Sequence, residues 1–126
     1  MDATLPKAEK LCGRSAVEAL FTQGRAFQSG CLRCRSLIRE DDGPVRILVS
    51  VPKRHFKRAV KRNLLKRRIR EAYRRQKSLA GSGLDLLFVY TPTEELPYEA
   101  IFADMAAALA AAVGREMQTI DNQKDV

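Results

Sequence analysis

Several residue types and patterns are scarce in this sequence of 126 residues. It holds one histidine, His55, and three cysteines, Cys12, Cys31 and Cys34. The longest apolar run, 105–113, has nine residues, whereas a membrane-spanning helix needs about twenty. The first residues also lack the basic and apolar regions of a secretory signal. We therefore expect a soluble cytoplasmic protein that neither spans a membrane nor is secreted.

The few reactive side chains do not form a catalytic or metal-binding pattern. Cys31 and Cys34 have C-x-x-C spacing, but a second pair is missing, and residues three apart in a strand point to opposite faces. Free, partly buried thiols in a reducing compartment are the better interpretation. A nucleophilic set would need His55, which has no acid close in sequence, and the acidic pairs 41–42 and 94–95 are typical of turns. We expect no catalytic residue and no metal ligand in the polypeptide.

Acidic residues are almost missing from one segment. Thirteen basic residues lie between Lys53 and Lys77 with a single acid, Glu71, so this segment carries a charge of +12. The rest of the chain carries −4, which gives the net charge of +8. A basic patch confined to one segment is more often a binding site than a means of solubility. The charge indicates a polyanionic partner, either a nucleic acid or an acidic membrane surface.

Hydrophobic patterning predicts one α+β domain over residues 11–117, a sandwich of sheet and helices, between a flexible arm (1–10) and a flexible tail (118–126). The expected order is helix, three strands, helix, strand, helix. The elements are placed at 13–21, 25–29, 31–39, 46–51, 57–79, 84–90 and 98–117. Ser15 and Glu18 are expected to form a capping box for the first helix.

The helix expected at 57–79 has two distinct faces. Its predicted buried stripe consists of Leu65, Ile69, Ala72, Tyr73 and Leu79. A cationic ridge lies on another face, stacked by spacings of three and four residues, and consists of Asn63, Lys66, Arg67, Arg70, Arg74 and Lys77. Like charges on one helix repel each other, and the planar fork of arginine suits phosphate, so a bound polyanion explains this ridge better than a solvated face does.

A second basic surface is expected on the strand at 31–39. Successive side chains of a strand point to opposite faces, so Arg33, Arg35 and Arg39 are expected to share one face. Such a sheet surface can hold single-stranded RNA. An ordinary outward polar face is an equally good interpretation.

The residues from Arg62 to Arg70 closely resemble the signature of the bacterial ribonuclease P protein component, which is R-N-R-x-x-K-R or a near variant of it, with a further Arg one turn on. Arg62, Asn63, Lys66, Arg67 and Arg70 match this signature. The segment 49–54, V-S-V-P-K-R, is similar to the family's strand ending in S-V-x-K-K/R, and Phe21-x-x-Gly24 resembles its F-x-x-G. The match in element order covers about residues 10–115.

The resemblance implies a fold like the second domain of a ribosomal small-subunit protein, with a left-handed strand-helix-strand crossover. It also implies an accessory subunit of a ribonucleoprotein. Its catalytic RNA, with bound magnesium, removes the 5′ leader of precursor tRNA. The protein side chains themselves would bind no cofactor, and one monomeric protein would bind one RNA, away from any membrane.

The resemblance further implies the roles of particular residues. The residues expected to face the catalytic RNA are Lys53, Arg54, Arg62, Asn63, Lys66, Arg67, Arg70 and Arg74. A cleft between sheet and helices would hold the single-stranded leader, with contributions from Phe21, Arg33 and Arg35. Three positions depart from the family pattern: Leu64 stands where an arginine is usual, Val17 where an aromatic residue is frequent, and Tyr90 near an expected arginine.

Two other functions are consistent with the basic helix. A non-catalytic RNA-binding module of ribosomal type could share the fold, and cleavage of precursor tRNA separates the two. A DNA-binding protein would prefer duplex DNA, but no helix-turn-helix is evident because a strand precedes the basic helix.

Overall fold

The computed structural model describes the backbone of residues 7–125 and the side chains of residues 8–113. Residues 1–6 of the expected arm, and Val126, lie outside the described residues. The helices are α1 (Arg14–Gln23), α2 (Ala59–Arg74) and α3 (Tyr98–Asp125), with short 3-10 helices at Lys7–Glu9 and Lys77–Ala80. The strands are β1 (Arg25–Ser29), β2 (Leu32–Ile38), β3 (Arg46–Ser50) and β4 (Leu84–Tyr90). The predicted α+β class and element order are confirmed.

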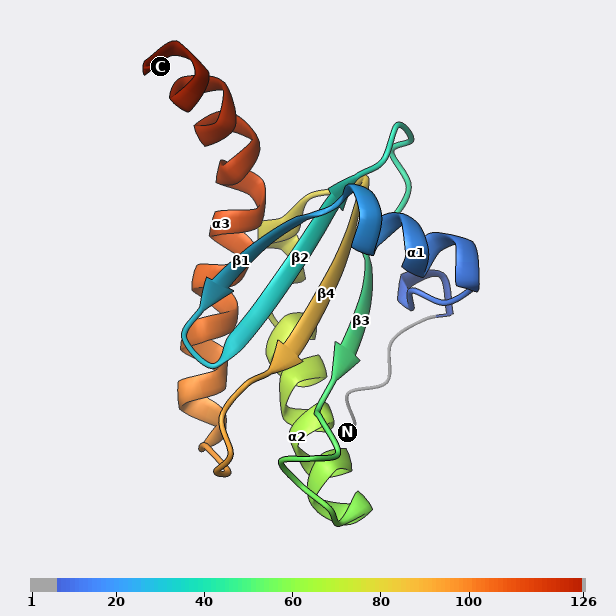
Figure 1. The fold of residues 1–126 in the computed structure, drawn as a ribbon, viewed down its shortest axis with the longest axis vertical. Helices are drawn as coiled ribbons and strands as arrows, with labels where there is room; N and C mark the ends of the chain where they lie inside the picture. The colour runs from blue at the N-terminus through green and yellow to red at the C-terminus, as the bar shows by residue number, and fades with distance from the viewer. Residues whose placement is uncertain (1–6, 126) are drawn as a thin grey trace.

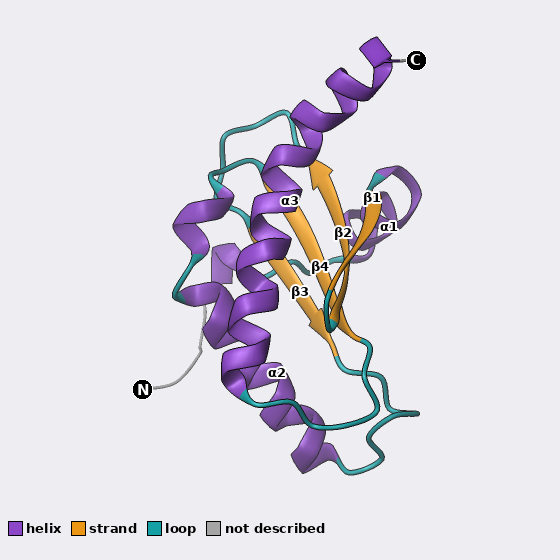
Figure 2. Cartoon of the chain, turned by 90° about the vertical axis from the view of Figure 1, so that its left-hand side faces the viewer, coloured by secondary structure: helices purple, strands orange, loops and turns teal. Residues whose placement is uncertain are grey.

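The four strands form one sheet in the order β1-β2-β4-β3. β1 with β2 and β2 with β4 are antiparallel, whereas β3 and β4 are parallel. The parallel pair requires a crossover, and α2 supplies it (Figure 1). In Figure 1 the arrows of β3 and β4 point the same way and β4 lies to the left of β3. Figure 2 places α2 on the face of the sheet opposite α1, which is the face turned away from the viewer in Figure 1. The crossover is therefore left-handed, against the usual right-handed rule.

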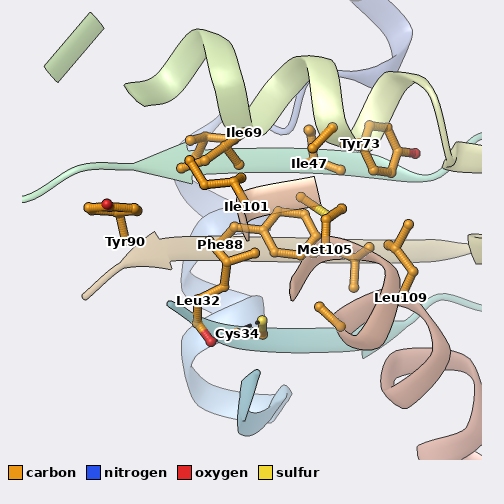
Figure 3. Packing of buried hydrophobic residues seen from close by; sticks show 14 of the residues in the cluster. Leu32, Cys34, Ile47, Ile69, Tyr73, Phe88, Tyr90, Ile101, Met105 and Leu109 are labelled. Atoms are coloured by element: carbon orange, nitrogen blue, oxygen red, sulfur yellow. Dashed lines mark hydrogen bonds between the residues drawn. The ribbon is translucent and has the colours of Figure 1, made fainter. Parts of the chain in front are cut away.

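Helices cover the two faces of the sheet unequally. α2 and α3 pack on one face, and α1 lies over the other (Figure 2). The larger core lies under α2 and α3, where side chains of β2, β3 and β4 meet those of both helices (Figure 3). A smaller cluster of Leu11, Leu20 and Leu87 lies under α1. The face under α1 is called the open sheet face below, because Ala26, Gln28 and Arg33 on it stay exposed.

The ends of the helices differ from the sequence prediction in three places. Gly13, not Ser15, is the N-cap of α1, and no side chain caps this helix, so the predicted capping box is wrong. Helix α2 ends at Arg74, and Leu79 falls in the following 3-10 helix. Leu79 is 52% exposed, so its predicted place in the buried stripe is wrong. The backbone of α3 stays helical to Asp125, beyond the expected end at residue 117.

The segment before α1 is attached to the sheet edge. Lys10 forms a parallel bridge with Ile47, and the Leu11 amide donates to the Ile47 carbonyl at 2.8 Å. The Glu9 carboxylate binds Lys77 Nζ at 3.0 Å. These contacts cover part of the outer edge of β3, so residues 9 and 10 belong to the folded unit rather than to a free arm.

Candidate nucleic-acid interface

The loop between β3 and α2 presents the first basic side chains. The Pro52 carbonyl accepts hydrogen bonds from the backbone amides of residues 55 and 56, which close a turn. Arg62 Nη1 donates to the carbonyls of Phe56 and Lys57 at 2.8 and 2.9 Å. Lys53 and Arg54 are both exposed on this loop. Arg62 therefore ties the loop to α2 and holds these two cations near the start of the helix.

Helix α2 buries one stripe and leaves a basic face uncovered. Leu65, Ile69, Ala72 and Tyr73 are buried, as predicted. Four polar residues on another face, Asn63, Lys66, Arg67 and Arg70, are named here the free face. Within the described part of the chain, no carboxylate forms an ion pair with the three cations of this face.

Other cations of the same helix already have partners. Lys61 and Arg68 both bind the Glu95 carboxylate, at 2.6 and 3.0 Å. Arg68 Nη1 also donates to the Leu96 carbonyl at 2.7 Å. These bonds tie the β4–α3 loop to α2. The Lys61 ammonium, followed by Arg68, lowers the pKa of the Glu95 carboxyl.

The end of the predicted ridge is also paired. Arg74 binds the Glu71 carboxylate through two hydrogen bonds of 2.6 and 2.8 Å, which lower the Glu71 pKa. Lys77 binds Glu9, as described above. The six residues of the predicted ridge therefore divide into the four of the free face and these two ion-paired cations.

The open sheet face holds the three residues that were expected at the leader. Arg33 is exposed on β2, and no hydrogen bond or ion pair joins its side chain to another described residue. Phe21, at the end of α1, is 51% exposed. Arg35 is half-buried, and its guanidinium lies over the Phe21 ring at 5.5 Å from the centroid. The fold thus brings Phe21 and Arg35 together and leaves Arg33 two residues away on the same strand.

Arg39 does not belong to this basic surface. Its Nη1 binds the buried Asp85 carboxylate at 2.7 Å, and Arg46 binds the same carboxylate through two further bonds. Asp85 is 2% exposed, so two arginines compensate one buried charge. Arg39 also binds Asp41, whose Oδ1 accepts the Gly43 amide at 2.8 Å. Asp41 is therefore a turn carboxylate, as predicted.

Among the described residues, the cysteine and histidine side chains are not gathered into a metal-binding cluster. The described residues contain no group of three or more His, Cys, Asp or Glu side chains that could hold a metal ion. Cys31 and Cys34 are buried free thiols, and burial raises the pKa of each to about 12. For Cys31 a hydrogen bond with Asp104 adds to the shift. Over the same described range, no helix is long and apolar enough to cross a bilayer.

The comparisons with known proteins agree on one family. The family model Ribonuclease P matches residues 5–113. The ribonuclease P protein component of Chlorobaculum tepidum is 41% identical over 85 residues, which are 64% of this chain and 55% of the relative. That of Porphyromonas gingivalis is 37% identical over 101 residues, 74% of each chain. The chain thus spans about half of one relative and three quarters of the other.

Solved structures support the same fold. The Staphylococcus aureus RNase P protein has a TM-score of 0.73 at 21% identity and covers 84% of this chain and 96% of its own. The Thermotoga maritima RNase P protein has a TM-score of 0.70 at 23% identity and covers 80% and 94%. The family model and these relatives show that the chain belongs to the ribonuclease P protein family.

Proposed function

We propose that the free face of α2 binds the catalytic RNA of ribonuclease P. The observation that carries this proposal is the absence of acidic partners for Lys66, Arg67 and Arg70 within the described residues. Asn63 lies among these cations and offers a donor and an acceptor to a sugar or a base edge. Spacings of three and four residues align the four side chains along one line, as phosphates are aligned along an RNA strand.

Four further residues support this surface in different ways. Lys53 and Arg54 extend it past the start of α2, because both are exposed. Arg62 acts by fixing the loop that carries them, through its bonds to two loop carbonyls. Arg74 extends the surface at the other end, where its pairing with Glu71 reduces the charge it offers to RNA.

We further propose that the open sheet face holds the single-stranded 5′ leader of precursor tRNA. Bases stack on aromatic rings and on guanidinium planes, and cations bind the connecting phosphates. Phe21 offers an exposed ring, and Arg33 offers an exposed charge that no described residue pairs on this face. Arg35 lies between the sheet and Phe21.

The proposed role in catalysis is electrostatic. Two RNAs are both polyanions and repel each other, and fixed positive charge between them reduces that repulsion. The protein would thereby strengthen binding of the substrate and of magnesium, which the RNA subunit holds. One protein chain per RNA is the proposed stoichiometry, and the cytoplasm, where precursor tRNA is made in bacteria, is the proposed location.

Binding of ribonuclease P RNA at a series of salt concentrations tests the role of the free face. Replacing Arg67 and Arg70 together with alanine is expected to weaken binding and to flatten the slope of log K against log salt. Each lost phosphate contact should reduce that slope by roughly 0.7 to 0.9.

Arg75→Ala is the matched control. Arg75 is an exposed cation at the C-terminal end of α2, and its guanidinium lies over the Phe102 ring of α3. Its loss should leave the slope nearly unchanged. An unchanged slope in the double variant would contradict the proposal and make the free face an ordinary solvated surface.

A further inference from the structure

Arg35 makes three contacts with the last turn of α1. Its Nε donates to the Leu20 carbonyl at 3.3 Å, and its Nη2 donates to the Phe21 carbonyl at 2.7 Å. Its guanidinium carbon lies 5.5 Å from the centroid of the Phe21 ring. One side chain of β2 therefore binds both the backbone and the aromatic ring at the end of this helix.

The end of α1 has few other polar attachments. The last carbonyls of a helix lack partners within the helix, and α1 has no basic residue in its own last turn. The Gly24 amide satisfies one of them, at the Leu20 carbonyl. Arg35 supplies a second donor to that oxygen and the donor to the Phe21 carbonyl. Its positive charge also suits the negative end of the helix dipole.

Apolar packing against the sheet holds Leu20 of α1 in place, but it does not hold the ring of the next residue, Phe21. Leu20 is fully buried against Leu87 and the neighbouring apolar side chains of the sheet. Phe21, the next residue, points its ring outward and is 51% exposed. Apolar packing therefore holds the helix, while the ring of Phe21 has Arg35 as its cationic contact.

We infer that Arg35 is a positioning residue, which holds α1 and the exposed ring of Phe21 at the rim of the open sheet face. This inference rests on the proposed binding of the leader at that face. Two of the guanidinium nitrogens are engaged by carbonyls and its plane lies near a ring, so Arg35 acts on the leader through Phe21. Arg33, whose charge is unpaired among the described residues, supplies the phosphate contact of this strand.

The experiment uses the assembled holoenzyme and two precursor tRNAs, one with a short leader and one with a leader several nucleotides long. The quantity measured is the ratio of their KM values, called the leader effect, together with kcat for each. The variants are Phe21→Ala, Arg35→Met, Arg35→Lys, the double variant Phe21→Ala with Arg35→Met, and Arg33→Met. A general loss of folding would change KM for both substrates, whereas a positioning role changes their ratio.

Phe21→Ala is expected to reduce the leader effect by about fivefold or more, the range of a base stacked on an aromatic ring. Arg35→Met should reduce it to a similar extent with kcat preserved, and the double variant should show no further reduction. Arg35→Lys should resemble Arg35→Met, because a single ammonium cannot reproduce the planar fork on two carbonyls and a ring. The salt slope of leader binding should stay unchanged in Arg35→Met and fall by roughly 0.7 in Arg33→Met.

Two results would overturn the inference. A direct phosphate contact by Arg35 would appear as a normal leader effect in Arg35→Lys together with a flatter salt slope in Arg35→Met. A structural role without consequence for RNA would appear as a leader effect unchanged in Arg35→Met although Phe21→Ala reduces it. If leader length had no effect in the wild-type holoenzyme, the proposed leader site itself would fail, which is a separate outcome.

Discussion

Basic residues of this protein differ mainly in whether another part of the chain already binds them. Arg67 and Arg68 are neighbours, yet Arg68 binds Glu95 and a loop carbonyl whereas Arg67 has no carboxylate partner among the described residues. Glu95 comes from a loop after β4, far along the chain. Spacing alone could therefore locate the cationic ridge but could not separate its free members from its paired ones.

The same limit applies on the sheet. Arg33, Arg35 and Arg39 form one alternating row in the sequence, which predicts one basic face. In the structure Arg35 binds the end of α1 and Arg39 binds a buried carboxylate, whereas Arg33 has no ion pair or side-chain hydrogen bond with any described residue. Their partners lie in three different elements, so no local pattern assigns them.

Asp41 is expected to make stability depend on pH in the acid range. Its hydrogen bond from Arg39 lowers the Asp41 pKa from the ordinary 3.8 to about 2. A lowered pKa stabilises the folded state above the ordinary value, and this contribution disappears as the pH falls toward the lowered one. The difference in urea midpoint between wild type and Asp41→Asn should be full at neutral pH and should shrink between pH 3.8 and about 2.

The neighbouring Asp42 is exposed and makes no ion pair within the described residues, so Asp42→Asn is the control. A difference for Asp41→Asn that stays constant over this pH range would contradict the assigned cause.

The three cysteines are expected to react at different rates. Cys12 is exposed, whereas Cys31 and Cys34 are buried with pKa values raised to about 12. Only a thiolate attacks a thiol reagent, so the two buried groups should be protected in the native protein near neutral pH. Counting labelled thiols by mass spectrometry should give one rapid modification in the native state and three after denaturation. Rapid labelling of all three in the native protein would contradict this burial.

The sequence predicts helices and strands correctly where apolar residues form an unbroken run or repeat at a constant spacing. The strand at Leu84–Tyr90 is found at its predicted bounds, and the buried stripe of α2 is correct over four of its five residues. Errors occur where the backbone changes type, as at the 3-10 helix that exposes Leu79, because helical periodicity continues past the true end of α2. The left-handed crossover was implied only by the family resemblance, since periodicity contains no information on handedness.

Helix α1 is expected to be sensitive to its closing glycine. A Cβ on Gly24 would lie 2.3 Å from the Leu20 carbonyl oxygen and 3.0 Å from that of Ser36 on β2. Gly24→Ala must therefore displace the end of α1 from the sheet, at a cost of about 1–3 kcal/mol in the free energy of unfolding. Urea denaturation measures this loss.

Gly81→Ala, at a position where an added Cβ meets no atom within 4 Å, separates crowding from other effects of removing a glycine. Because Gly81 has a positive φ, some destabilisation is expected there from backbone strain alone. The account would be contradicted if Gly24→Ala caused no loss of stability.

The charge of the whole molecule is arranged for a polyanionic partner rather than for solubility. The segment from Lys53 to Lys77 carries +12 and the remainder −4. This segment forms the β3–α2 loop, α2 and the turn after it. Glu95 ties the β4–α3 loop to α2, and Asp85 binds Arg39 and Arg46 at the sheet. Within the described residues no acid pairs with the cations of the free face of α2.

Cleavage of a precursor tRNA by a bacterial ribonuclease P RNA, at low magnesium and with or without this protein, tests the central claim most directly. The account predicts that the protein alone is inert, and that its addition to the RNA switches on correct removal of the 5′ leader. It also predicts that the variant lacking Arg67 and Arg70 needs more magnesium or more protein for the same rate. Tight binding to RNA without any change in cleavage would contradict the account and favour a non-catalytic RNA-binding module.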